Sequence, residues 1–330
     1  MSIAPILETL LAGHDLDFAT ASAVFADLLD GRLSEGQAAA LLIALRSKGE
    51  SATELAAAAT AALARAHLVR GLPSPRMDTC GTGGDGRQSF NCSTAVALLL
   101  ADMGYTMVKH GNRAVSSTCG SADIVEALGL PMAQTPQSAA AAAQERRFVF
   151  LFAPHFHPAF ARIAPLRRAL GVRTLFNLLG PLINPARPTH QVLGVPEERL
   201  VPIMSAALAQ IGVERAAVVH GAGGFDELTP CGPGLVAFVH GTMVREATIH
   251  PESFGFDAYP PESLTCADKA DAIARQQEVL AGQGPAPLQA MVALNLGLAL
   301  HLLENLPLAE AMAMARDKVA QGVSQEVRHA

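Results

Sequence analysis

The feature that most constrains the fold is a repeated pattern of apolar strand, glycine-rich loop and helix in the second part of the chain. The segment "YTMVKHGN" (105–112) runs from an apolar strand into polar residues, and "SSTCGSADIVEALG" (116–129) then begins a helix. Two further strands are "FVFLFAP" (148–154) and "ERAAVVHGAGGFDE" (214–227). Strands that alternate with helices predict a mainly parallel central sheet, and ligands of such sheets bind at the carboxyl ends of the strands.

The first seventy residues have another pattern, that of consecutive helices. Segments that begin at Ser34 and Ser51 match the Ser-x-x-Gln/Glu capping box, and Gly49 lies where a helix is expected to end. We therefore predict an α/β protein with a small all-helical domain, residues 1–72, and a larger α/β domain, residues 73–330.

Composition excludes several classes of function. The formal net charge of −6 over 330 residues disfavours a general nucleic-acid binder, so any basic cluster must be local. Five cysteines without a C-x-x-C pair fit a reducing, cytoplasmic location. No secretory signal is visible, and the longest apolar run, residues 288–303, contains Asn295 and His301. We expect that run to be a buried helix and expect no membrane partner.

The stretch "DTCGTGGDG" (78–86) contains G-x-G-x-x-G, which alone is weak support for dinucleotide binding. The preceding residues lack a long Val/Ile-rich strand, and Asp85 would repel a bare pyrophosphate. The helix that follows is more informative, because Asn91, Ser93 and Thr94 stand at its start. Their side chains and the positive end of the helix predict an anion site.

A second loop, "KHGNRAVSSTCGSAD" (109–123), is rich in hydrogen-bond donors and follows a strand. Fifteen residues supply seven polar or basic side chains: Lys109, His110, Asn112, Arg113, Ser116, Ser117 and Ser121. Such a density of donors suits a polyanion.

A pair of carboxylates, Asp226 and Glu227, follows a glycine turn at the end of another apolar strand. Mg²⁺ prefers a few carboxylate or hydroxyl oxygens, with the remaining ligands from water and substrate phosphate. Opposite a phosphate site, the pair therefore predicts a magnesium site. Magnesium would also make Asp85 tolerable in a loop that binds diphosphate.

The segment 155–185 carries several basic residues, of which Arg167 is the most useful, because arginine can hold a planar carboxylate with two parallel hydrogen bonds. His155 and His157 could form a metal pair. No Cys or carboxylate lies at ligand spacing from them, which disfavours that interpretation.

Four motifs in order resemble those of the anthranilate phosphoribosyltransferases of tryptophan biosynthesis. They are "GTGGDG" with "FNCST", "KHGNRAVSSTCGSADIVEALG", "HPAFARIAPLRRALGVRTLFNLLGPLINPARP" and "GFDEL", and "LLDGRLSEGQAAALLIALRSKGES" also looks like the helical domain of that family. The resemblance covers roughly residues 5 to 300. Near the C-terminus, "CADKADAIARQQ" replaces the G-G-D-x-x-x-N segment common in the family, and this difference touches none of the motif residues.

The resemblance implies that the larger domain, residues 73–330, is a phosphoribosyl-binding domain and that helices within about 160–185 complete the helical domain. It also implies a homodimer formed through the helical domain and an active site between the domains. It implies transfer of the phosphoribosyl group of phosphoribosyl pyrophosphate (PRPP) to the amine of anthranilate. The residues expected to bind PRPP are Gly81, Gly84, Asp85, Ser89, Asn91, Cys92, Ser93, Thr94, Lys109, His110, Gly111, Asn112, Arg113, Ala114, Val115, Ser116, Ser117 and Ser121.

The same resemblance places anthranilate against Gly81, Asn112 and Arg167, with His110, His157 and Pro181 nearby. Ser93, Asp226 and Glu227 are expected to bind Mg²⁺. We expect Lys109 and Asn112 to act in catalysis by electrostatics and positioning, with no general base assigned, because an arylamine is already a competent nucleophile.

Two alternatives remain open from the sequence. A pyrimidine nucleoside phosphorylase has a related fold. Its phosphate loop begins with a Lys-x-Ser-T-G-G-like element, whereas Thr79 and Cys80 precede the glycines here, and that family lacks an acidic pair for magnesium. A nucleic-acid-binding relative without transferase activity would need a basic groove, which the acidic total charge disfavours.

Overall fold

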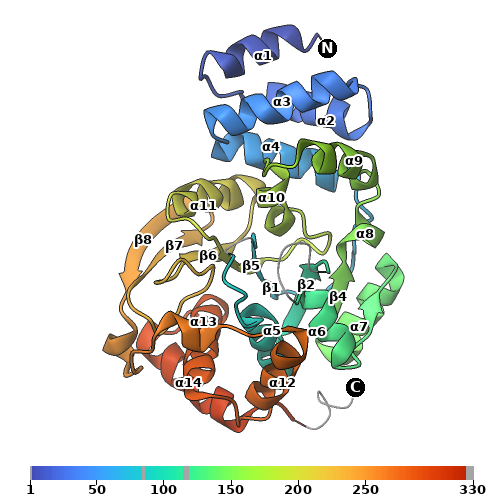
Figure 1. The fold of residues 1–330 in the computed structure, drawn as a ribbon. Coiled ribbons are helices and arrows are strands. Elements are labelled where there is room, and N and C mark those ends of the chain that lie inside the picture. Colours follow the sequence, from blue (N-terminus) through green and yellow to red (C-terminus); the bar gives the residue numbers. More distant parts are fainter. Residues whose placement is uncertain (1, 84–85, 114–118, 325–330) are drawn as a thin grey trace.

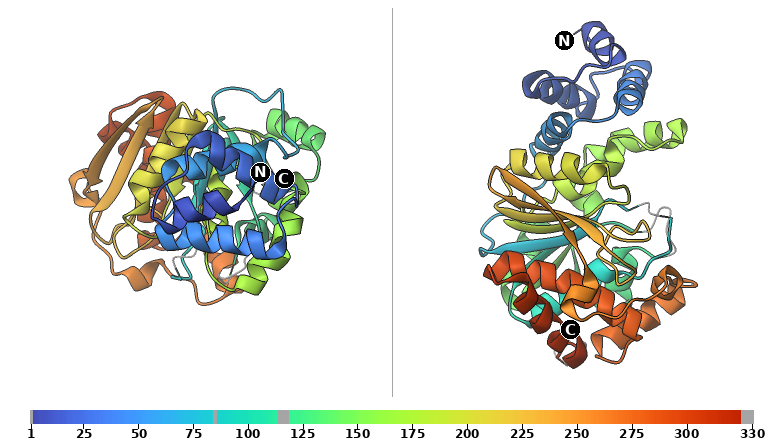
Figure 2. Two further views of the ribbon diagram at one scale, coloured as in Figure 1. Left: turned by 90° about the horizontal axis from the view of Figure 1, so that it is seen from above. Right: turned by 90° about the vertical axis from the view of Figure 1, so that its left-hand side faces the viewer.

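Four N-terminal helices stand on top of a larger α/β body (Figure 1). The computed structural model describes residues 2–83, 86–113 and 119–324. The four helices are α1 (Ala4–Leu11), α2 (Phe18–Leu29), α3 (Glu35–Lys48) and α4 (Ala52–Leu63). Figure 2 shows them as a separate layer in the side view.

Both predicted capping boxes are present. The hydroxyls of Ser34 and Ser51 accept hydrogen bonds from backbone N–H groups three residues on, and the side chains of Gln37 and Glu54 accept in return from the backbone N–H of each serine. Gly49, with φ of 92°, ends α3 as expected. These local signals therefore fix where two of the helices begin.

A single sheet of eight strands forms the centre of the α/β body. Its order is β3-β4-β2-β1-β5-β6-β7-β8. The first six strands in this order are parallel to one another, whereas β7 is antiparallel to both β6 and β8. The strands are β1 (Arg76–Gly81), β2 (Thr106–Gly111), β3 (Met132–Ala133), β4 (Phe148–Phe152), β5 (His190–Gly194), β6 (Arg215–His220), β7 (Gly234–His240) and β8 (Met243–Ile249). The mainly parallel sheet is thus confirmed, with an antiparallel hairpin added at one edge.

Helices cover both faces of the sheet. On one face lie α5 (Cys92–Asp102), α12 (Lys269–Leu280), α13 (Ala286–Glu304) and α14 (Leu308–Gln321), whose apolar residues form one core. On the other face, α11 (Leu200–Ile211) shares a core with the N-terminal helices and with α9 (Phe160–Leu170) and α10 (Phe176–Leu179). The remaining helices are α6 (Ser121–Ala127), α7 (Pro136–Arg146) and α8 (Ala153–Phe156). Three short 3₁₀ turns cover Gly180–Leu182, Pro251–Phe254 and Pro261–Leu264.

Helix α13 is long and apolar enough to cross a membrane, but 72% of its apolar window is buried inside the protein. It packs against α5 and α14 in the core, as the sequence analysis expects of a buried helix. The helices at 160–185 pack against α2, α3 and α4, whereas the predicted boundary at residue 72 stays a prediction.

Candidate functional site

The donor-rich loops follow strands that run parallel, so they meet at one edge of the sheet. β1, β2 and β6 end at Gly81, Gly111 and His220. The backbone N–H of Gly83 donates to Oδ2 of Asp226 at 3.3 Å, and Nζ of Lys109 donates to Oγ of Ser93 at 3.0 Å. Three stretches far apart in the sequence therefore converge on one site.

Asp226 lies directly against the ends of two strands. A Cβ added to Gly194 would come within 1.4 Å of the Asp226 carbonyl oxygen, and one added to Gly81 within 2.2 Å of Oδ2. Only glycine permits this approach. The sequence analysis named Gly81 but missed Gly194, because a glycine at a strand end has many possible causes.

Asn295 on α13 holds the backbone that follows the acidic pair. Its Oδ1 accepts from the N–H of Leu228 at 3.0 Å, and its Nδ2 donates to the Leu228 carbonyl at 2.8 Å. Asn295 was noted in the sequence only as an interruption of an apolar run. A polar side chain within a buried helix was the available signal, since buried amides need partners.

Ser93, Asp226 and Glu227 line one cavity with about 250 Å³ of empty space, part of it open. Two carboxylates and a hydroxyl form an oxygen donor set that suits Mg²⁺, which takes its other ligands from water and substrate phosphate. No group of three His, Cys, Asp or Glu suited to a metal occurs in the part of the chain that the structure describes. The donor set therefore fits a magnesium ion that binds together with a substrate phosphate. It does not fit a metal site in which the protein supplies every ligand.

Lys109 is buried, and only 2% of it is exposed. Its ammonium donates to the Thr79 carbonyl at 2.6 Å as well as to Ser93. Burial lowers the pKa of Lys109, and the charges of Asp78 and Glu227 oppose that lowering. Lys109 thus orients Ser93 and places a buried cation close enough to Glu227 to feel its charge.

Asp78, which the sequence analysis did not name, lies fully buried in β1 beside Lys109. Burial raises the pKa of Asp78 to about 6, against the favourable charge of Lys109 and a hydrogen bond from Asn184. Asn184 Nδ2 donates to Asp78 Oδ2 at 2.8 Å and to the Val108 carbonyl at 2.7 Å. The Asn184 amide therefore links β1 to β2 at the residue that precedes Lys109.

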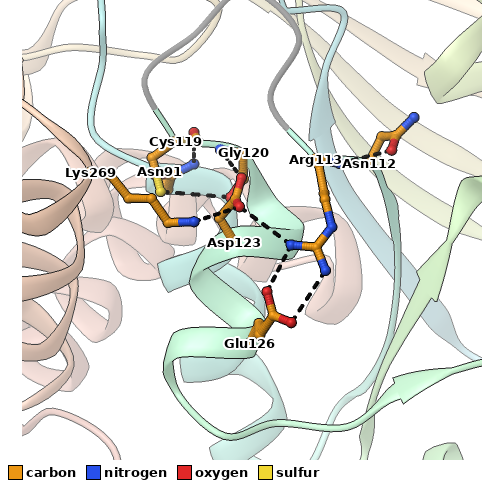
Figure 3. A network of polar contacts seen from close by, with 8 residues as sticks. All are labelled: Asn91, Asn112, Arg113, Cys119, Gly120, Asp123, Glu126 and Lys269. Atoms are coloured by element: carbon orange, nitrogen blue, oxygen red, sulfur yellow. Dashed lines mark hydrogen bonds and ion pairs between the residues drawn. The ribbon is translucent and has the colours of Figure 1, made fainter.

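A network of ion pairs fixes the start of α6 (Figure 3). Asp123 Oδ2 accepts from the Gly120 N–H at 2.9 Å, while its Oδ1 accepts from Lys269 at 2.7 Å. Arg113 makes two hydrogen bonds to Glu126, at 2.7 and 3.2 Å. The guanidinium expected to face PRPP is therefore engaged by a carboxylate in this structure.

The two anion loops are also tied to each other. Asn91 Nδ2 donates to the Cys119 carbonyl at 3.2 Å (Figure 3). Within the second loop, Ser121 packs closely against Gly111, because a Cβ added to Gly111 would come within 2.4 Å of Ser121 Oγ. Cys92 and Thr94 are fully buried at the start of α5, and their contact with PRPP stays a prediction.

Of the remaining predicted residues, Ser89 pairs with Thr265 in an isolated β-bridge, and Asn112 Oδ1 accepts from the Arg113 N–H at 2.8 Å. The predicted residues Gly84, Asp85, Ala114, Val115, Ser116 and Ser117 lie outside the described residues.

A row of rings leads from β2 to α10. The rings of His110 and His157 lie 5.1 Å apart, His157 stacks on Phe160 at 5.4 Å, and Phe160 meets Phe176 at 5.5 Å. Burial lowers the pKa of His110 to about 3 and that of His157 to about 4. Both imidazoles are therefore neutral at pH 7. Pro181 is buried, and its carbonyl accepts from Gln191 at 2.8 Å.

Arg167 lies at the far end of this row. Its guanidinium carbon is 5.5 Å from the centre of the Phe176 ring, and burial lowers the pKa of the half-buried side chain. A cation held over an aromatic face beside an aromatic row can receive a planar aromatic carboxylate.

Comparison with known proteins agrees with this geometry. Residues 74–325 match the model of the glycosyl transferase family a/b domain, and residues 4–66 match its helical bundle domain. The chain is 53% identical to an anthranilate phosphoribosyltransferase of Nitratidesulfovibrio vulgaris, with 98% of each chain covered. It is 40% identical to one of Chloroflexus aggregans, covering 100% of this chain and 97% of the relative.

Solved structures are similar over nearly the whole chain. The anthranilate phosphoribosyltransferase of Thermus thermophilus superposes with a TM-score of 0.90 at 38% identity, covering 98% of this chain and 96% of that one. The enzyme of Saccharomyces cerevisiae in complex with PRPP and Mg gives a TM-score of 0.86 at 26% identity, covering 98% and 94%.

We predict that Gly194→Ala weakens the binding of Mg²⁺ in the presence of pyrophosphate by about tenfold or more. The new Cβ would overlap the Asp226 carbonyl, so the acidic pair must move. Isothermal titration calorimetry measures the binding. Gly36→Ala is the matched control, because a Cβ there meets nothing within 4 Å. An unchanged titration of the Gly194 variant would contradict the placement of Asp226.

We predict that His157 makes the protein less stable in acid. Its pKa is about 4 in the folded state and about 6.5 when unfolded, so between these values only the unfolded chain binds the proton. The free energy of unfolding should therefore fall as the pH decreases from about 6.5 to 4, by at most about 1.4 kcal/mol per unit for this group. Urea titrations at several pH values measure the free energy of unfolding. Its decrease with falling pH should be smaller in His157→Gln than in the unmodified protein, and unchanged in the exposed control His14→Gln.

Proposed function

We propose that this chain, which belongs to the anthranilate phosphoribosyltransferase family, transfers the phosphoribosyl group of PRPP to the amine of anthranilate and releases pyrophosphate. The observation that carries the proposal is the convergence of Ser93, Lys109 and the Asp226–Glu227 pair at the carboxyl ends of parallel strands. That arrangement places oxygen ligands for a cation and a buried positive charge where a diphosphate can dock.

The proposed PRPP site consists of the two loops after β1 and β2. Ser93 and the backbone of the glycine loop face the diphosphate, and Lys109 supplies positive charge from beneath. Asn91 holds the two loops together through its hydrogen bond to the Cys119 carbonyl. We propose that Arg113 exchanges its bonds with Glu126 for the substrate, since both groups are largely exposed and an exposed ion pair is weak.

Ser93, Asp226 and Glu227 are the residues that would hold Mg²⁺, because all three line one cavity. A relative from Saccharomyces cerevisiae has been solved in complex with PRPP and Mg, which supports the choice of the ion. When bound, the ion would neutralise charge on the diphosphate oxygens and assist departure of the leaving group. The chain's own contribution is to keep the acidic pair in place through Gly81, Gly194 and Asn295, and to orient Ser93 through Lys109.

The row from His110 to Arg167 is the proposed path and binding site of anthranilate. Arg167 would hold the carboxylate, and the neutral rings of His110 and His157 would line the path to the sugar. Asn112, just after β2, and Gly81, at the end of β1, lie where the two substrates would meet. Saccharomyces cerevisiae relatives have been solved in complex with 4-fluoroanthranilate.

The mechanism that this geometry supports is electrostatic. Negative charge builds on pyrophosphate as the bond to the anomeric carbon breaks, and Lys109 together with Ser93 stabilises it from a buried position where charges are screened poorly. The amine, oriented through the distant carboxylate, attacks the positively charged sugar carbon. Positioning of the two substrates supplies the rest of the rate.

We also propose a homodimer formed through the helical domain, residues 1–72. Leu11, Phe18 and Ile43 are large apolar side chains that remain 42% exposed or more on these helices. Such a group supports an association surface. The five cysteines, all present as free thiols, support a cytoplasmic location.

The decisive experiment is a transfer assay with PRPP, anthranilate and Mg²⁺, followed by loss of anthranilate fluorescence and release of pyrophosphate. Activity should require all three and should stop when EDTA removes the metal. Phosphorolysis of thymidine is the parallel assay for a pyrimidine nucleoside phosphorylase. Thymidine cleavage without anthranilate consumption would overturn the proposal.

We predict that Lys109→Met lowers kcat by about a hundredfold or more, because it removes a charge that acts in the transition state while it conserves volume. Steady-state kinetics with a circular dichroism melt measure the effect and verify folding. Lys269→Met, which removes a half-exposed ammonium bonded to Asp123, is the control and should change kcat much less. Near-normal turnover of the Lys109 variant would exclude its role.

We predict that Arg167→Ala raises the KM for anthranilate by about tenfold or more, through loss of a charged hydrogen bond, and leaves the KM for PRPP unchanged. Arg168→Ala changes the exposed neighbour and should alter neither value. If both KM values of the Arg167 variant rise equally, the arginine is structural.

A further inference from the structure

Gln191 in β5 is a buried polar side chain that no step of the proposed mechanism uses. Only 1% of it is exposed. Its Nε2 donates to the Pro181 carbonyl at 2.8 Å and to Cys80 Sγ at 3.2 Å. Burial of an amide is unfavourable unless the amide makes hydrogen bonds, so the bonds of Gln191 matter to the structure around it.

The sheet determines which groups this amide can reach. Gln191 pairs with Asp78 in the register between β5 and β1, and Cys80 lies two residues further along β1 on the same face. Burial raises the pKa of the Cys80 thiol, so the sulfur stays protonated and is a weak acceptor. The Pro181 carbonyl is the stronger partner. It is also the one backbone polar group of that residue, because proline has no N–H.

Pro181 lies where the row of rings meets the sheet. Its 3₁₀ turn, Gly180–Leu182, follows the four residues of α10 without a break. Figure 1 shows α10 between α4 and the sheet. A helix of four residues cannot hold its own position, since isolated helices shorter than about 12 residues are marginal. The position of α10 therefore depends on contacts near its two ends.

The two ends of α10 are held differently. Before its start, the Thr174 N–H donates to Asn177 Oδ1 at 3.0 Å, a bond that lies within the segment and moves with it. Just past its end, the bond between Pro181 and Gln191 ties the segment to a central strand. Apolar packing of Phe176 also buries α10, but such packing is not directional. The Gln191 amide therefore supplies a directional anchor to the sheet.

Helix α10 carries the ring that faces Arg167. The Arg167 guanidinium carbon lies 5.5 Å from the centre of the Phe176 ring, and Phe160 meets the same ring edge-on at 5.5 Å. Burial lowers the pKa of Arg167, and no charged neighbour among the described residues contributes to that shift. The aromatic face is thus the group that orients this cation, and a displaced Phe176 would displace the cation with it.

We infer that Gln191 is a positioning residue of the anthranilate site. Its amide holds the Pro181 carbonyl, the turn fixes the end of α10, and α10 places Phe176 against Arg167. Gln191 acts through these groups and not by contact with the reacting atoms. The identity of the ligand rests on the proposed function, whereas the anchoring of α10 does not.

Gln191→Met tests the inference, because methionine has a similar length and cannot donate to the Pro181 carbonyl. The KM for anthranilate should rise about threefold to tenfold, the usual effect of losing one buried hydrogen bond. The values of kcat and of the KM for PRPP should change much less. A merely structural glutamine would not divide the two KM values in this way.

Gln276→Met is the matched control. Gln276 is also fully buried, but it lies in α12 on the other face of the sheet, and neither of its amide atoms makes a hydrogen bond among the described residues. The same chemical change there should leave both KM values unaltered. Thermal melts by circular dichroism verify folding, and Gln191→Leu repeats the test with a second apolar side chain.

Hydrogen–deuterium exchange measures the anchoring without any substrate. The N–H groups of Leu178 and Ile183 bond to Leu175 and Gly180, within the segment 174–183 itself. Exchange over this segment should therefore increase in Gln191→Met, which frees it from the sheet, and stay unchanged in Gln276→Met.

A double variant tests whether Gln191 acts through Arg167. In the Arg167→Ala background, Gln191→Met should raise the KM for anthranilate much less than it does alone, because two changes that remove one arrangement are not additive. Fully additive effects would show that the two residues act independently and would overturn the inference.

The inference is also overturned if exchange over 174–183 does not change, if both KM values rise together, or if neither apolar variant folds, since Gln191 would then be a residue of general stability. The proposed function fails in another way, when the unmodified protein consumes no anthranilate. In that case the exchange measurement still decides whether Gln191 anchors α10.

Discussion

The close packing of Asp226 against the backbone of Gly81 and Gly194 is the constraint on which the rest of the site depends. The residue has room only because Gly81 and Gly194 lack side chains, and it is held by the Gly83 N–H and, through Leu228, by Asn295. The ends of two parallel strands, β1 and β5, and a buried helix thus determine the position of one carboxylate. A site built in this way keeps its donors fixed before any ligand arrives, and fixed donors lose little entropy on binding.

The second constraint is the buried charge of Lys109. A lysine with 2% exposure would lose its proton easily, but Asp78 lies in the adjacent strand and Glu227 lies across the cavity. Asn184 fixes Asp78 by a hydrogen bond and fixes β2 by another. The cation is therefore supported by a small polar cluster within the sheet. This explains how a chain with a net charge of −6 can present positive charge to a diphosphate.

Much of this organisation could be predicted from the sequence. Capping boxes at Ser34 and Ser51, the parallel strands and the grouping of the three loops all follow from local patterns that the chain obeys independently of its tertiary structure. Asp78 and Asn184 could not be found in this way. A single aspartate in a short strand and an asparagine in a loop have no distinctive spacing, and their role appears only when β1 and β2 pair. The antiparallel β7–β8 hairpin was missed for the same reason, since strand direction depends on the partner.

The charges around the second loop also favour the proposed cation at the substrate site. Arg113 is engaged by Glu126, and Lys269 by Asp123, so these two basic groups are already neutralised in the structure (Figure 3). Lys109 faces the acidic pair from below, and one buried positive charge does not balance Asp226 and Glu227 together with a diphosphate. Mg²⁺ held by those two carboxylates would reverse the sign of the local potential. The acidic pair, which by itself would repel the substrate, is then the element that makes its binding possible.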